Sequence, residues 1–163
     1  MSTSTLYLVN KKNVRQVAEF QNGFGTAPVL WRFLCKEYLN EAPDSWLFIA
    51  QKDKSLWNLV NDPKVPLSLR LAHAFTFTHA VCSSDKKHIL AEALLDTHKI
   101  THGFSPDHVN HWQSIGNFIK TMKPFPKSQG IGLNCTSIYD GWLEWERDVK
   151  KVQNIFDLAG EDK

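Results

Sequence analysis

Four histidines lie close together in the middle part of the chain, with two aspartates among them. The histidines are His98, His102, His108 and His111, and the aspartates are Asp96 and Asp107. Neutral imidazoles and carboxylates are the ligands that Zn²⁺ or Fe²⁺ takes in proteins. His98 and His102 are four residues apart, a spacing that places two rings on one face of a helix. The cluster therefore predicts a zinc or iron site, and with it a metal-dependent enzyme.

The sequence around these histidines departs from established metal motifs. Lys-Ile-Thr separates His98 from His102, so the glutamate of an HExxH helix is missing. No Glu-x-x-His pair of the di-iron kind occurs in the chain. The helix is expected to end before His102, and the helix dipole alone favours histidine near a C-terminus. Structural or surface histidines are therefore the preferred interpretation, and the metal enzyme is the alternative.

Other candidates for catalysis have less support in the sequence. His73 and His79 lie six residues apart in an apolar stretch, so on an ideal helix they point about 120° away from each other. A buried neutral imidazole is expected there, with general-base catalysis as the alternative. Cys35 and Cys135 lack an activating context, although a helix starting just after Cys135 would favour its thiolate. The glycines of Gly130-Ile-Gly132 are not followed by the lysine of a phosphate-binding loop.

Six tryptophans give the chain an excess of large aromatic side chains. Trp31 lies off the apolar face of its predicted helix, and Trp46 and Trp57 bracket a segment whose helical pattern is interrupted. Exposed tryptophan is uncommon on a monomer and is enriched where proteins bind each other. These three residues are therefore candidate contacts with a protein partner or with a second copy of the chain.

The elements that must position these residues are predicted to be helices. Apolar residues recur at three- and four-residue spacing along most of the chain, and we expect helices over about 14–20, 27–40, 46–60, 66–82, 84–100, 106–122 and 137–159. Residues 130–134 are expected in a loop, residues 1–10 in an extended arm and residues 160–163 in a frayed tail. The predicted fold is all-α, a single compact bundle of six or seven helices that spans residues 1–163.

Composition and charge set further bounds. A chain of 163 residues with 42% hydrophobic and 22% charged residues is typical of one globular domain. The net charge of only +2, with scattered lysine pairs, does not predict a nucleic-acid partner. Three cysteines without a CxxC pair do not form a disulfide framework. With neither a signal peptide nor a run long enough to span a bilayer in the sequence, we expect a soluble, cytoplasmic protein without membrane contact.

Weak catalytic motifs, low net charge and surplus tryptophan together favour one function. The prediction is a non-catalytic helical protein-interaction module, such as an adaptor, a regulator or an immunity-type inhibitor. Its partner is another protein or a second copy of itself, and it needs no cofactor. Zinc or iron belongs only to the alternative, the metal-dependent enzyme of residues 96–111.

Overall fold

The computed structural model describes residues 3–21, 26–40, 54–77, 79–104, 111–135 and 152–160. These ranges contain six α-helices and a five-stranded sheet. The protein is therefore a mixed α/β fold, and the prediction of an all-α helical bundle is wrong. Predictions for residues 41–53, 105–110 and 136–151 lie outside the described ranges, and so do residues 161–163 of the predicted tail.

The elements have the following bounds. The strands are β1 (Thr3–Val9), β2 (Val14–Gln21), β3 (Ala80–Ser83), β4 (Gly130–Asn134) and β5 (Gln153–Asn154). The α-helices are α1 (Ala27–Tyr38), α3 (Lys54–Asn58), α4 (Leu67–Phe75), α5 (Lys87–Thr101), α6 (Trp112–Thr121) and α8 (Ile155–Ala159). Three short 3₁₀ helices adjoin them, η1 (Leu59–Asn61), η2 (Ser84–Lys86) and η3 (His102–Phe104).

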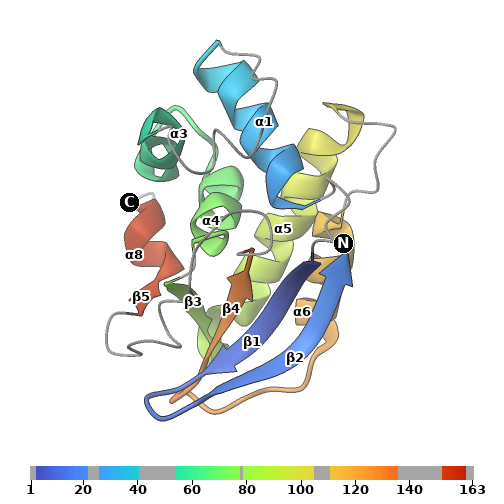
Figure 1. Ribbon diagram of the computed structural model, residues 1–163, viewed down its shortest axis with the longest axis vertical. Helices are drawn as coiled ribbons and strands as arrows, with labels where there is room; N and C mark the ends of the chain where they lie inside the picture. The colour runs from blue at the N-terminus through green and yellow to red at the C-terminus, as the bar shows by residue number, and fades with distance from the viewer. Residues whose placement is uncertain are drawn as a thin grey trace.

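The sheet has the strand order β2-β1-β4-β3-β5. All neighbouring strands are antiparallel except β3 and β5, which are parallel. Helices α5 and α6 lie behind β1 and β2 in Figure 1, so the sheet and these helices form two layers. Side chains from both layers share one hydrophobic core, in which Leu6, Ile131, Phe75, Leu90 and Trp112 are fully buried or nearly so.

The N-terminal part of the chain is a β-hairpin and not an arm followed by a helix. Strand β1 is an inner strand, paired with β2 on one side and with β4 on the other. The pairing with β2 shifts between Leu6 and Tyr7, because β2 holds one extra residue, Val17, at that point. This bulge breaks the two-residue alternation of apolar side chains in β2. Val14, Val17 and Phe20 consequently fall at the spacing of a helix, which explains the wrong prediction.

Strands β3 and β4 also replace predicted structure. The expected helix over 66–82 ends at Phe75, where the Thr76 hydroxyl donates a 2.6 Å hydrogen bond to the His73 carbonyl. The chain then enters β3. Apolar residues continue from α4 into β3, so the sequence gives no sign that the helix ends. Strand β4 was expected to be a loop because of its two glycines, yet a Cβ on Gly130 would lie only 2.9 Å from the Val81 Cβ. Glycine is therefore needed for β3 and β4 to approach each other.

Three predicted helices are confirmed within the described residues. Helix α1 begins after Thr26 with proline in its first turn, and α5 follows the predicted course to Thr101. Helix α6 buries Trp112, Ile115 and Ile119 on the face that the sequence indicated. None of the described helices is long and apolar enough to cross a membrane.

Candidate functional site

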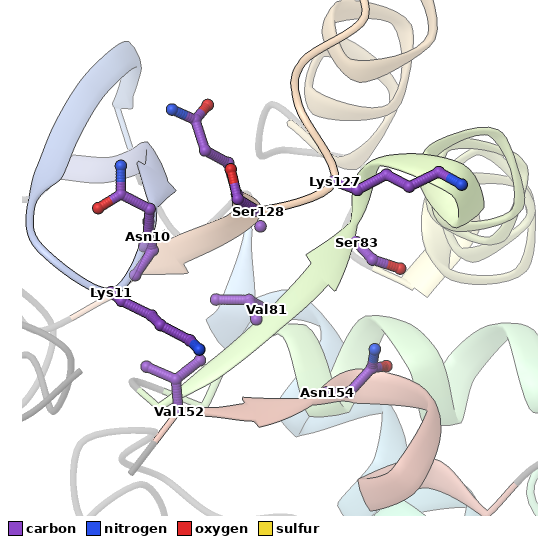
Figure 2. Close-up of a pocket in the computed structure, with 11 residues that line it drawn as sticks. Asn10, Lys11, Val81, Ser83, Lys127, Ser128, Val152 and Asn154 are labelled. Atoms are coloured by element: carbon purple, nitrogen blue, oxygen red, sulfur yellow. The ribbon is translucent and has the colours of Figure 1, made fainter. Parts of the chain in front are cut away.

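An open pocket of about 230 Å³ lies at one end of the sheet, and we call it the sheet-end pocket. The end of β1 and the loop after it form one side, and β3, residues 127–129 before β4, the start of β4, Val152 and β5 form the rest (Figure 2). These segments are far apart in the sequence and meet only because of the strand order. The pocket is thus a product of the sheet topology.

The floor of the pocket is apolar and belongs to the sheet face opposite the core. Cys82 and Ile131 pair across β3 and β4 and point into the core, so their neighbours Val81 and Gly130 belong to the other face. On that face Val81 and Val152 pack against Val9 in a small hydrophobic cluster, separate from the main core. The missing side chain of Gly130 leaves the room for Val81. A patch of half-buried valine therefore faces the pocket.

The rim of the pocket is polar and is held by hydrogen bonds from backbone N–H groups to asparagine side chains. In the hairpin loop the Asn10 Oδ1 accepts hydrogen bonds of 2.8 Å from the backbone N–H groups of Lys12 and Asn13. This fixes the loop from which Lys11 extends toward Val152 (Figure 2). Across the pocket, the Asn154 Oδ1 accepts a 2.9 Å hydrogen bond from the Phe156 backbone N–H at the start of α8.

A second lysine stands at the far rim but is directed elsewhere. Figure 2 shows the Lys127 side chain running beyond Ser83 and away from Lys11. A hydrogen bond from the Ser83 side chain lowers the pKa of the Asp85 carboxyl, and the charges of Lys127 and Lys86 add to the effect. Lys127 is therefore near an acid outside the pocket, whereas Lys11 is the lysine that reaches over the pocket.

The described lining residues of the pocket have the chemistry of a binding site. They include valines and lysines, and no histidine, cysteine, aspartate or glutamate occurs among them. Beneath the pocket, burial raises the pKa of the Cys82 thiol to about 12, which keeps it protonated and unreactive. What the described groups can do is hold an apolar group against valine and an anionic group against lysine.

The predicted metal cluster is only partly brought together. His98 on α5 and His102 on η3 lie side by side, with ring centroids 5.1 Å apart. Asp96 accepts a 3.2 Å hydrogen bond from the Ser68 hydroxyl on α4. His111 occupies the position before α6 without a side-chain capping hydrogen bond, and burial lowers its pKa. Within the described ranges no three metal-ligating side chains converge, and Asp107 and His108 lie outside those ranges.

The predicted tryptophan contacts lie in different surroundings. Trp31 is fully buried on α1, and its Nε1–H donates a 3.3 Å hydrogen bond to the Thr76 hydroxyl. Trp57 on α3 is half-buried and meets Trp31 edge to face, with ring centroids 5.4 Å apart. Trp46 lies outside the described residues. The described lining residues of the sheet-end pocket, in contrast, include none of the predicted tryptophan or metal contacts.

The thiols of Cys82 and Cys135 are not activated in this fold. All three cysteines are buried, and none forms a disulfide among the described residues. Burial raises the pKa of the Cys135 thiol to about 12, although its contact with the Ser4 hydroxyl, at 3.9 Å, acts in the opposite direction. A thiolate nucleophile at Cys135 is therefore not supported.

Comparison of the chain with protein-family models, with curated proteins and with solved structures finds no match. The arguments about function therefore rest on the geometry of the described residues.

Proposed function

We propose that this chain is a non-catalytic protein-interaction module that binds a short segment of a partner protein in the sheet-end pocket. One observation carries the proposal: an open hollow has a floor of valine and a rim with lysine, without a carboxylate among its described residues. The complementary segment has an apolar side chain that enters the pocket and an acidic residue that faces Lys11. A role as adaptor, regulator or inhibitor is compatible with such binding.

The size of the pocket fits one or two side chains of a partner segment. Its volume of about 230 Å³ is below the roughly 300–1,000 Å³ of sites that enclose a drug-sized ligand. One or two side chains fill such a space, while a dinucleotide or another large cofactor does not. Binding energy at protein interfaces also concentrates in a few such anchors.

The outer edge of β2 supports the pocket as the contact site and not strand addition along this strand. Strand β2 is at the end of the strand order, but it is bulged at Val17 and exposes the charged side chains of Arg15 and Glu19. Bulges and charges are the features with which proteins protect edge strands from pairing with another chain. The partner segment is therefore placed across the end of the sheet and not along β2.

A cytoplasmic location is part of this proposal. Cys35, Cys82 and Cys135 form no disulfide among the described residues, and cysteines without disulfides are typical of proteins in a reducing compartment.

Selection from a peptide library tests the proposed function. Phage that display random peptides are selected on the full chain, and the enriched peptides are expected to combine an apolar residue with neighbouring acidic ones. Val81→Thr puts a hydroxyl on the pocket floor and should weaken the selected peptides roughly ten-fold. Ile89→Thr makes the same kind of change at an exposed position on α5 and should leave binding unchanged.

Three results would reject the proposed function. They are the absence of enriched peptides, peptides that bind the Val81→Thr variant as well as the parent, and a Val81-dependent dimer in light scattering. The last result would make a second copy of the chain the occupant of the pocket.

A further inference from the structure

The pair of imidazoles at the end of α5 stands apart from the sheet-end pocket and is not used by the proposed function. His98 is half-buried and His102 is exposed. Their ring centroids are 5.1 Å apart and their planes are inclined by 40°. Both rings are therefore on one side of the helix, and the outer one is open to solvent.

The separation of the rings matches that of two ligands on one metal ion. Imidazole nitrogens bind Zn²⁺ at about 2.0 Å, and tetrahedral geometry then puts the two ring centroids about 5 Å apart. The observed separation of 5.1 Å agrees with this value.

A second observation concerns a nitrogen of His98. Its Nδ1 is buried and has no hydrogen-bond partner among the described residues. A buried polar atom without a partner costs free energy, and native proteins rarely leave one so. A cation bound at this imidazole pair would supply the missing partner. The buried Nδ1 of His98 and the spacing of the two rings therefore both favour a cation bound at this pair.

We propose that His98 and His102 form a two-nitrogen chelate for a divalent transition-metal ion such as Zn²⁺, Ni²⁺ or Cu²⁺. Imidazole prefers these borderline ions over Mg²⁺ or Ca²⁺, which prefer oxygen. No third metal-ligating side chain converges on the pair within the described ranges, so water completes the coordination. This is a binding site for metal, separate from the binding of a partner segment.

Titration of Zn²⁺ into the full chain, purified without a histidine tag, tests the chelate. Calorimetry of the parent should show a Zn²⁺ site that EDTA empties, and Mg²⁺ should give no such signal. His102→Gln should weaken this site at least ten-fold or so, because two ligands held on one helical face bind far more tightly than either alone. His98→Gln should have the same effect, and the double variant should be little worse than either single one.

Two control variants separate the chelate from other histidines. His88→Gln changes an exposed imidazole on the same helix, and His111→Gln changes the half-buried imidazole just before α6. Both should bind Zn²⁺ like the parent.

The proposal is overturned if the parent shows no such site, or if His102→Gln binds Zn²⁺ as the parent does. Loss of the site in the His88→Gln or His111→Gln variant would also overturn it. Because His102 is exposed, its variant keeps the fold, and circular dichroism verifies this. The result therefore stands even if His98→Gln unfolds.

Discussion

The imidazole of His73 stacks on the indole of Trp57, with ring centroids 5.4 Å apart and planes inclined by only 11°. Phe77 meets both rings edge to face. The His73 Nε2 lies 2.9 Å from the Leu56 carbonyl oxygen, so a neutral ring that donates from Nε2 satisfies that carbonyl. His73 thus joins α4 to α3 as an uncharged aromatic side chain.

Stability should fall as the pH falls, because His73 resists protonation in the fold. Burial lowers its pKa from 6.5 to about 4, and the hydrogen bond to Leu56 opposes this only in part. At a pH between these two pKa values, His73 is protonated in the unfolded chain and neutral in the folded chain. The free energy of unfolding therefore decreases from pH 6.5 toward pH 4. The full loss is on the order of 3 kcal/mol.

Urea unfolding at two pH values measures this effect. Between about pH 7.5 and pH 5 the parent should lose about 2 kcal/mol more than the His73→Gln variant, in which this group does not titrate. Equal losses in parent and variant would show that His73 is not protonated on unfolding. The comparison between variants removes the contributions of carboxylates, which both proteins share.

Gly130 should be indispensable for the contact between β3 and β4. A methyl group there would lie 2.9 Å from both the Cβ and the Cγ2 of Val81. Gly130→Ala should therefore lower the free energy of unfolding by about 1–3 kcal/mol, as overpacking does. Gly103→Ala is the matched control, since nothing lies within 4 Å of a Cβ at that position. Urea unfolding of the two variants should give clearly different midpoints, and similar midpoints would contradict the packing described.

Arg70 should hold α8 in place. Its side chain is only 3% exposed, and it donates hydrogen bonds of 2.8 Å to the Val65 carbonyl and of 2.8 Å and 2.6 Å to those of Ala159 and Gly160. Arg70→Met keeps the bulk but leaves these oxygens without their donor, so it should cost about 3 kcal/mol.

Hydrogen exchange tells whether this loss is local. The amides of residues 155–160 should lose protection first in the Arg70→Met variant. Arg15→Met, at an exposed position on β2, should leave both stability and exchange unchanged. Unaltered protection of α8 would mean that contacts other than those of Arg70 hold this helix.

The sequence indicated the helices well where helical spacing and caps agreed. Helix α6 has buried residues at 112, 115 and 119, and α1 has a threonine before it and a proline in its first turn. The burial of His73 was also expected, because it lies in an apolar segment. In these cases local preference and tertiary packing act in the same direction.

The strands were missed for physical reasons that particular residues show. The bulge at Val17 gives β2 the spacing of a helix, and Gly130 is essential to β4 although glycine usually marks a loop. The sheet-end pocket joins Lys11, Val81 and Val152. Their proximity depends on strand order, which no local pattern encodes. The His98 and His102 pair, by contrast, was visible because its spacing lies within one helix.

The most direct test of the proposed binding compares Lys11→Glu with Lys12→Glu on a library-selected acidic peptide. Both residues are exposed in the same loop and both changes alter the net charge equally, but only Lys11 lines the pocket. We expect Lys11→Glu to weaken binding roughly ten-fold at low salt, because the attraction between Lys11 and the acidic peptide becomes a repulsion. Lys12→Glu should weaken binding by less than about three-fold. Equal effects of the two variants, or no effect of Lys11→Glu, would contradict binding in the sheet-end pocket.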